Sequence, residues 1–180
     1  MAGAGARPLR AGWRAGREPA QGGPKITISL VTAPEGPNLA LRKKYDCSDP
    51  NKYNWGLGGL TNGSWTADAQ NCFATNDAPT LPKHVTIDLE QPARIGTVLA
   101  GVPPFGSTKA ITVAVSLDGK EFKEVGSHEF SLRKAERWTW SFAPVEARYV
   151  RLIYPDRHEQ GVDYPNTFAF TTEVEVYGAK

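Results

Sequence analysis

Short segments in which apolar and polar residues alternate recur along the chain, separated by residues that favour turns. In residues 84–89, for example, valine, isoleucine and leucine alternate with threonine and aspartate. Successive side chains of a β-strand point to opposite faces, so this alternation predicts strands with one buried face. The other segments of this type are residues 25–32, 95–102, 111–117, 122–125, 138–142, 148–154 and 170–177.

Together these segments predict an all-β fold, namely a jelly-roll β-sandwich of about eight antiparallel strands. Asp118 and Gly119 predict a hairpin turn between two of them, and Gln91 with Pro92 predicts a turn between another pair. Residues 148–154 form the most continuous run, so we expect this strand near the centre of a sheet. The 18 glycines and 14 prolines agree with a fold that is rich in turns.

The first 24 residues differ in composition from the rest of the chain. Four arginines stand there among alanine, glycine and proline, which predicts a disordered tail or linker over residues 1–24. Residues 25–180 then form a single domain, in which residues 38–41 start a second segment after the first strand and residues 156–164 form a polar loop. This domain is close to neutral, which favours neither nucleic acid nor an anionic membrane as a partner. The chain has no run of 18 apolar residues that could span a membrane and no apolar core of a secretory signal.

Two cysteines, Cys47 and Cys72, enclose 24 residues and form no CxxC pair. This spacing excludes a zinc ribbon and a thioredoxin-type redox site. A disulfide between them would cross-link a long irregular loop, but two free buried thiols also agree with the sequence.

The stretch from residue 42 to residue 77 lacks the strand period and is longer than an ordinary connection, which favours a functional role. Within it, residues 58–66 combine three glycines with closely spaced side-chain oxygens. Glycine lets the backbone fold back, so several oxygens can point at one place. This loop is therefore a candidate cation site, closed by a C-terminal strand that carries Glu173 and Glu175.

Motifs of the common enzyme classes are absent, since the chain has no GxSxG, HExxH, P-loop or GxGxxG sequence. The three histidines, His84, His128 and His158, lie on different predicted elements, so we expect them at the surface. Glu173 and Glu175 share a strand face, and an exposed polar sheet edge is a commoner reason for this than a glycosidase pair.

Aromatic rings and planar polar side chains gather in the predicted loops, as in a sugar-binding site. An aromatic ring stacks on the apolar face of a pyranose, while arginine, asparagine and histidine bind its hydroxyl groups. Phe168 and Arg157 are the strongest candidates because their loops adjoin the last strands. The alternative is that such rings pack beneath their own loops. The predicted ligand-binding residues are Tyr53, Trp55, His84, Arg157, His158, Tyr164, Asn166 and Phe168.

Five sequence pieces occur in an order that resembles the discoidin domain, also called the coagulation-factor type C domain, and within it carbohydrate-binding module family 32. They are LTNGSW, HVTIDLEQPARIGTV, VAVSLDGKEFKEV, ARYVRLIY and TTEVEVYG. The resemblance implies a galactose-binding-like jelly roll, usually attached to a secreted glycoside hydrolase. Such modules bind terminal galactose, N-acetylhexosamine or fucose through loops at one end of the sandwich.

The resemblance also implies a structural calcium ion between the loop over residues 60–66 and the last strand. Hard oxygen ligands suit Ca²⁺. The family usually has aspartate where this chain has Asn62, which removes one negative charge and predicts weaker binding. The implied ligands are Leu60, Asn62, Ser64, Thr66 and Glu173.

The sequence therefore predicts a monomeric, extracellular, non-catalytic module that carries an associated enzyme to a glycan. One alternative is an adhesion domain that binds a protein or lipid surface through exposed Trp55 and Phe105. A second is a catalytic β-sandwich, a polysaccharide lyase or hydrolase, that uses His84 or His158 together with Tyr164 as acid and base.

Overall fold

The computed structural model describes residues 34–179, and this part of the chain is all β, without a helix. It therefore contains no helix that could cross a membrane. The tail expected over residues 1–24 and the strand expected over residues 25–32 lie outside the described residues. The strands are β1 (Tyr45–Cys47), β2 (Phe73–Ala74), β3 (Lys83–Val102), β4 (Gly106–Thr108), β5 (Ala110–Ser116), β6 (Lys123–Glu129), β7 (Glu136–Tyr154), β8 (Arg157–Val162), β9 (Phe170–Thr171) and β10 (Val174–Gly178).

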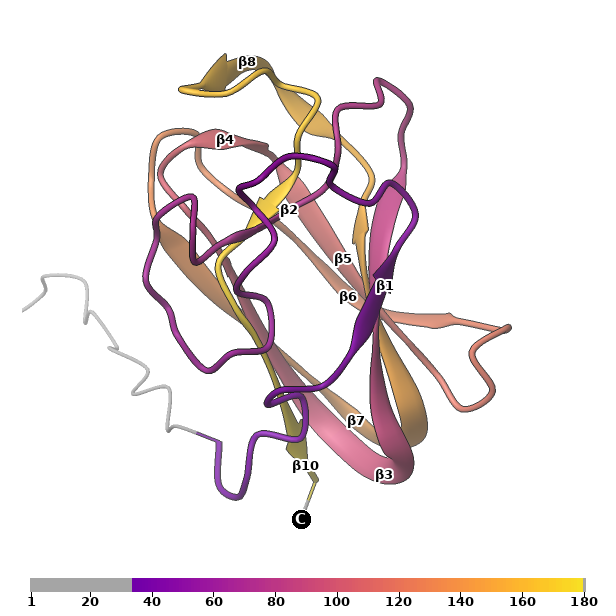
Figure 1. Cartoon of the computed structure of the whole chain (residues 1–180). Helices are drawn as coiled ribbons and strands as arrows, with labels where there is room; N and C mark the ends of the chain where they lie inside the picture. Colours follow the sequence, from indigo (N-terminus) through magenta and orange to yellow (C-terminus); the bar gives the residue numbers. More distant parts are fainter. Residues whose placement is uncertain (1–33, 180) are drawn as a thin grey trace, which may run out of the picture. The chain divides into compact units, whose positions relative to one another are not determined.

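Six of these strands form one antiparallel sheet in the order β1-β3-β7-β5-β6, with β10 also paired to β3. The remaining strands form two short ribbons, β2 with β9 and β4 with β8. Figure 1 shows β4 and β8 at one end of the domain and β10 at the other. We call the first of these the loop end, and it consists of residues 48–55, 76–82, 103–106 and 155–169.

The two longest strands, β3 and β7, make the sandwich by bending. β3 has 20 residues and β7 has 19, and they pair along most of their length. Their register shifts between Asp88 and Ala93 and again between Ile95 and Thr97. Such bulges bend a strand pair without ending it. One half of β3 pairs with β1 and the other half with β10, so the sheet folds over itself into two layers.

The turn expected at Gln91 and Pro92 is one of these bends. The strands expected on either side of it are therefore the two halves of β3, and β7 likewise joins two expected strands. Glu90 has a positive φ of 70°, and its N–H donates to Oδ1 of Asp88 at 2.7 Å. This local hydrogen bond stabilises the bend where the ladder is interrupted.

The hairpin expected at Asp118 and Gly119 is confirmed between β5 and β6. Gly119 has a φ of +76°, which glycine adopts at no steric cost. The carboxylate of Asp118 accepts the N–H groups of Lys120 and Glu121 at 2.9 and 3.1 Å. These contacts fix the turn, which projects from the side of the domain in Figure 1.

Two expectations for local structure are wrong. The polar loop expected over residues 156–164 contains β8. The strand expected over residues 170–177 is interrupted between β9 and β10 at Thr172 and Glu173. β8 has an exposed polar sequence because its only partner is the short strand β4, so the apolar alternation is missing.

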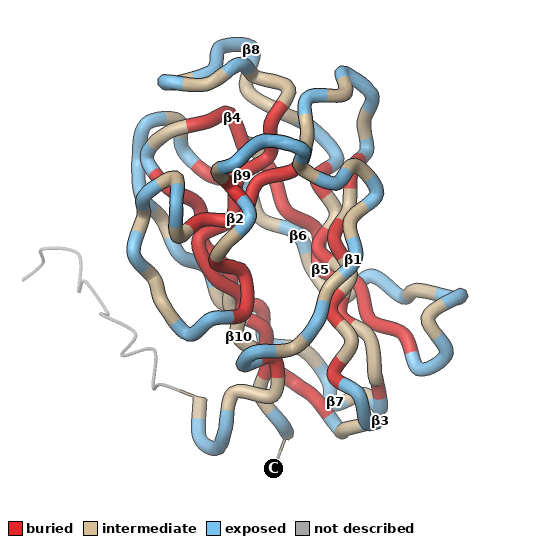
Figure 2. The backbone as a smooth tube through the Cα atoms, in the orientation of Figure 1, coloured by how far each residue is buried: buried red, intermediate tan, exposed pale blue. Residues whose placement is uncertain are grey.

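The main core lies between the two layers and is made by the inward side chains of the long strands. Val150 and Leu152 of β7 are fully buried, as expected for a central strand. Of the two tryptophans at alternate positions of β7, Trp140 is buried, whereas Trp138 is 43% exposed and stacks on His128 with ring centroids 3.8 Å apart. Figure 2 shows the buried positions running along the strands while exposed positions lie in the connections.

Cys47 and Cys72 are both free, so the disulfide considered above is not formed. Each thiol instead has its own nearby carbonyl. Sγ of Cys47 donates to the carbonyl of Asp49 at 3.4 Å, and Sγ of Cys72 donates to that of Thr66 at 3.9 Å. Burial raises the pKa of Cys47, and it raises the pKa of Cys72 to about 12.

Candidate functional site

Most of the aromatic residues predicted to bind sugar pack on one another at the loop end. Trp55 lies in the middle of this group and stacks on two other rings. Its ring centroid is 5.9 Å from that of Phe170, with an angle of 11° between the ring planes, and 5.3 Å from that of Tyr53, with an angle of 20°. Trp55 is therefore partly buried among these rings. We call this group the aromatic cluster, and its members are Tyr53, Trp55, Phe105, Tyr164, Phe168 and Phe170.

Phe168, the strongest candidate for sugar stacking, is only 4% exposed. Its ring lies 5.0 Å from that of Trp55 and 5.7 Å from that of Tyr53. Its ring therefore presents little surface to a ligand in this structure, so its exposure gives no support to the predicted stacking role. The alternative noted from the sequence, that such rings pack beneath their own loops, holds at this position.

Tyr53 differs from its neighbours because its side chain stays accessible. It is 43% exposed, with one side of its ring covered by Trp55. Its hydroxyl donates to Oδ2 of Asp77 at 2.9 Å, and this hydrogen bond raises the pKa of Tyr53. Its backbone N–H donates to Oδ1 of Asn51 at 2.7 Å. Tyr53 is thus a rigid aromatic surface with polar groups beside it.

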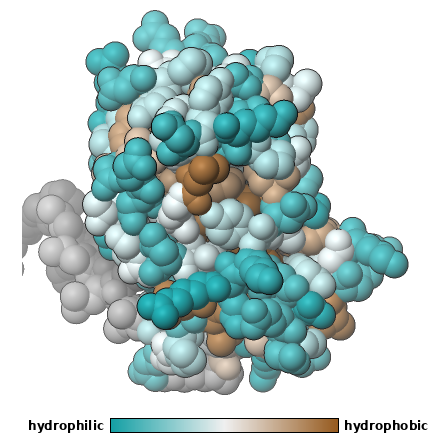
Figure 3. All heavy atoms as spheres, in the orientation of Figure 1, coloured by the Kyte–Doolittle hydropathy of each residue, from teal (hydrophilic) through white to brown (hydrophobic). Residues whose placement is uncertain are grey.

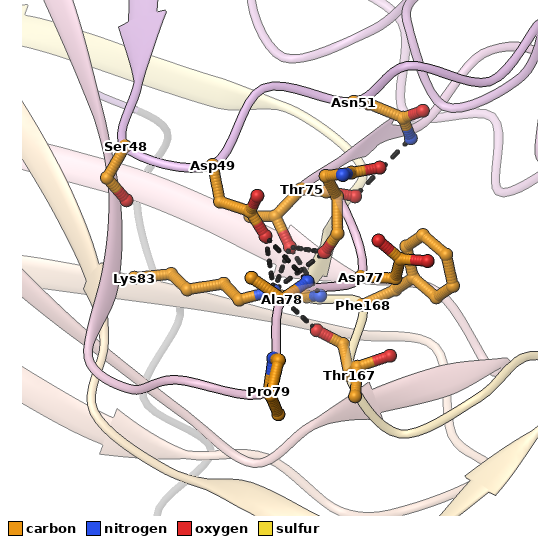
Figure 4. Close-up of polar contacts among 12 residues, drawn as sticks. Ser48, Asp49, Asn51, Thr75, Asp77, Ala78, Pro79, Lys83, Thr167 and Phe168 are labelled. Carbon is orange, nitrogen blue, oxygen red and sulfur yellow. Dashed lines mark hydrogen bonds and ion pairs between the residues drawn. The ribbon is translucent and has the colours of Figure 1, made fainter.

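A buried lysine holds the loops of this end together. Figure 4 shows the ammonium group of Lys83 among oxygen atoms from three segments. It lies 2.7 Å from Oδ2 of Asp49 and donates to the carbonyls of Asn76 and Thr167 at 2.6 and 2.7 Å. Asp49 also accepts the N–H of Ala78 at 3.1 Å. Because a buried charge is stable only when it is paired and hydrogen-bonded, these contacts fix the loops that carry Asp77 and Phe168.

The position of Lys83 in the sequence indicates that its side chain is buried, which the predictions above do not include. Lys83 stands two residues before Val85 in the alternation of β3, so it occupies an inward position. A lysine on the apolar face of a strand is buried only with partners. Those partners come from segments distant in the sequence, so periodicity alone does not identify them.

The predicted polar ligands at the loop end bind backbone carbonyls. Arg157 donates to the carbonyl of Pro79 at 3.1 Å, and Asn166 donates to that of Glu159 at 2.7 Å. Nε2 of His158 lies 3.0 Å from the carbonyl of Phe130. These side chains therefore join loops to one another. His84 lies apart from them, in a groove on the outer face of the sheet.

The glycine-rich loop joins the C-terminal segment as expected. Leu60 bridges to Glu173, and the N–H of Gly63 donates to Oε1 of Glu173 at 3.1 Å. Glu173 is fully buried, and its Oε2 has no hydrogen-bond partner among the described residues. Glu175 accepts from Trp65 at 2.9 Å. The exposed position expected for these two glutamates is therefore wrong for Glu173, whereas Glu175 is half-buried on β10.

The buried carboxylate of Glu173 is a type of donor that suits a calcium ion. The orphaned Oε2 of Glu173 is a hard, anionic oxygen that is free to bind a cation. The side-chain oxygens of the loop are partly used within it, because Oδ1 of Asn62 accepts the N–H of Ser64 at 2.8 Å and Oγ of Ser64 donates to Thr66 at 3.1 Å. No group of three acidic, histidine or cysteine residues gathers anywhere in residues 34–179. Glu173 is thus the one strong ligand.

Comparison with known families identifies the domain. The F5/8 type C domain family matches residues 44–168, which is more than half of the chain. The chain therefore belongs to this family, also known as the discoidin domain family. No curated protein matches its sequence.

Solved structures share the galactose-binding-like β-sandwich at low sequence identity. A family 32 carbohydrate-binding module of Clostridium perfringens, in complex with GalNAc-β-1,3-galactose, has a TM-score of 0.61 and 17% identity, over 75% of this chain and 94% of that one. The C-terminal domain of a chitobiase from Bacteroides fragilis has a TM-score of 0.61 and 18% identity, over 79% and 98%. The lectin-binding domain of lectinolysin, in complex with Lewis b, has a TM-score of 0.62 and 22% identity, over 82% and 100%.

Proposed function

We propose that this domain is a non-catalytic carbohydrate-binding module. It binds a terminal sugar of the galactose, N-acetylhexosamine or fucose type at the loop end. The observation that carries the proposal is Tyr53, an exposed ring held in place by Trp55 and Asp77. Membership of the F5/8 type C family and the sugars bound by similar structures support the same class of ligand.

The geometry suits a shallow site of modest affinity. A tyrosine with one free face can cover the apolar side of a pyranose, and its fixed position lowers the entropy lost on binding. Asp77 and the side chains around it offer acceptors and donors for the hydroxyl groups. The buried Lys83 contributes indirectly, since it fixes the loop that carries Asp77.

The test is a calorimetric or NMR titration with galactose, N-acetylgalactosamine and fucose. Tyr53→Ala should abolish binding, whereas Tyr53→Phe keeps the ring and should retain most of it. Trp138→Ala is a matched control, because Trp138 is equally exposed but lies on β7. Failure of all three sugars to bind, or binding that survives Tyr53→Ala, would overturn the proposal.

We also propose that the module acts outside the cell, as a monomer, on behalf of a linked glycan-active enzyme. A galactosidase fused to the domain should then hydrolyse an insoluble galactan faster than the same fusion with Tyr53→Ala. The two fusions should act equally on a small soluble galactoside. Equal rates on the insoluble substrate would argue against targeting.

A calcium ion at the glycine-rich loop is a further part of the proposal. Glu173 would supply the anionic ligand, with neutral oxygens from Leu60, Asn62, Ser64 and Thr66. Bound there, the ion would tie the loop to the C-terminal segment. Calcium should raise the melting temperature relative to EDTA, and Glu173→Gln should remove the difference.

The structure supports the two alternative functions less well. Trp55 and Phe105, expected as exposed adhesion residues, pack within the aromatic cluster. Figure 3 shows mainly hydrophilic residues on the visible face, with hydrophobic atoms in small separate patches. For the catalytic alternative, His84, His158 and Tyr164 have separate partners, so no acid and base pair forms from them.

A further inference from the structure

A second polar groove lies on the outer face of the large sheet, away from the aromatic cluster. It has a volume of about 560 Å³, which is within the range of ligand sites in proteins. Its floor comes from β1, β3 and β7, and the β5–β6 turn forms one wall. In Figure 1 this turn projects beside β1. None of the six residues of the aromatic cluster lines this groove.

A row of polar side chains crosses the floor in direct register. Asp46 of β1 pairs with Thr86 of β3, and Thr86 pairs with Arg151 of β7. Nε of Arg151 donates to Oγ1 of Thr86 at 2.8 Å, and its guanidinium lies 3.6 Å from the centre of the Phe122 ring. The arginine is therefore held in place from two sides.

Three groups of this floor point into the groove without a partner. The terminal nitrogens of Arg151, the carboxylate of Asp46 and the imidazole of His84 make no hydrogen bond with any described residue. Burial and the charge of Arg151 lower the pKa of His84, so its neutral ring offers one donor and one acceptor at neutral pH. Donors and acceptors thus stand side by side.

The composition of the groove defines the class of ligand. Its three acidic and three basic residues balance, so neither a polyanion nor a polycation is favoured. Alternating donors and acceptors suit a ligand that carries many hydroxyl groups, and the ring of Tyr149 offers an apolar surface beside them. The groove lies on a sheet face formed by three strands and not at a loop end, so the interior of a chain can lie across it. The charged residues are Lys44, Asp46, Asp88, Asp118, Lys120 and Arg151.

We propose that this groove is a second binding site, which takes an internal stretch of a neutral oligosaccharide chain. The inference shares with the proposed function only the class of ligand, because it uses different residues on a different face. Arg151, His84 and Asp46 bind the hydroxyl groups, and the β5–β6 turn limits how the chain lies.

The test is an NMR titration of the ¹⁵N-labelled protein with galactotetraose, chitotetraose, mannotetraose and cellotetraose, each to about 10 mM, a concentration that detects binding with a Kd near 1 mM. At least one of them should shift the amides of residues 44–46, 84–86 and 149–151. Asp46→Asn and His84→Ala should each lower the affinity for that tetrasaccharide by about tenfold, since each variant loses hydrogen bonds to the ligand. Glu124→Gln, an exposed change on β6, is the matched control and should leave affinity unchanged.

The outcomes separate this inference from the proposed function. If the amides around Tyr53 shift and the groove stays silent with all four tetrasaccharides, the groove proposal is overturned and the loop-end site stands. If the groove shifts alone, the loop-end site fails instead. Groove shifts that survive both Asp46→Asn and His84→Ala would also overturn the assignment, and circular dichroism of each variant verifies that it is folded.

Discussion

Lys83 places a positive charge inside the loop end, where only 2% of its surface is exposed. We expect Lys83→Met to destabilise the protein by about 3 kcal/mol, because the change leaves the half-buried carboxylate of Asp49 and the carbonyls of Asn76 and Thr167 without the buried ammonium group. Urea unfolding measures the loss. The same change at Lys109, whose pair with Asp156 is exposed, should cost about 1 kcal/mol or less. Equal losses of unfolding free energy in the two variants would show that burial does not decide how much an ion pair stabilises the protein.

Glu173 predicts a pH dependence of stability. Burial raises its pKa from 4.5 to about 7, although the N–H of Gly63 acts in the opposite direction. Between these two values the unfolded chain has released the proton and the folded chain has kept it. The folded state then binds more protons, so the free energy of unfolding falls as pH rises through this window.

Glu173→Gln is neutral at every pH and should remove that fall. In EDTA at pH 8 we expect the variant to be more stable than the parent by about 2 kcal/mol, and the two should converge below pH 4.5. Urea unfolding at a series of pH values measures both curves. Glu124→Gln is the control and should follow the parent. Parallel curves for parent and Glu173→Gln would contradict the assignment.

The glycine-rich loop, as an element, depends on close backbone approach more than on flexibility. Gly59 has a φ of +69°, and a Cβ placed on it would lie 2.0 Å from the carbonyl oxygen of Asn71. We expect Gly59→Ala to destabilise the domain by more than about 3 kcal/mol, since a backbone acceptor has no room to move aside. Gly36 also has a positive φ, of +102°, but nothing lies within 4 Å of its Cβ position. Gly36→Ala should therefore cost only about 1 kcal/mol, measured by thermal unfolding.

The elements that could be predicted from the sequence are those whose apolar residues alternate with polar or small ones. β3, β7 and β10 show this alternation because one face of each meets the core. β5 shows it too, although both of its faces are buried, because small and polar side chains fill its second face. A bulge with proline has the same local signals as a chain reversal, so the sequence predicts a turn where β3 bends. β8 gives no strand signal because it pairs with a short strand and buries little.

The candidate site was predictable in composition but not in arrangement. The sequence identifies aromatic residues in loops, yet it does not say which of them cover one another. Phe168 and Tyr53 are alike by that criterion, and only long-range packing buries the first and exposes the second. The groove around Arg151 arises from the register of three strands, which local periodicity does not determine.

At the scale of the whole domain, stability comes from the packing of apolar side chains and not from a cross-link. Inward residues of both halves of β3 and of β7 belong to the same cluster, which joins the two layers. A domain of this size buries enough apolar surface to fold without a disulfide. This agrees with the two free thiols, Cys47 and Cys72.

The free thiols lead to a prediction for the intact molecule. Because burial raises the pKa of both, little thiolate forms at pH 8, and we expect slow reaction with a thiol-specific disulfide reagent in the native state. In concentrated urea both thiols are exposed and should react rapidly with the same reagent. A reductant should leave the melting temperature unchanged, since no bond is present for it to break. A non-reducing mass that lacks two hydrogens, together with a lower melting temperature after reduction, would instead show that Cys47 and Cys72 are joined and that the loop between them rearranges.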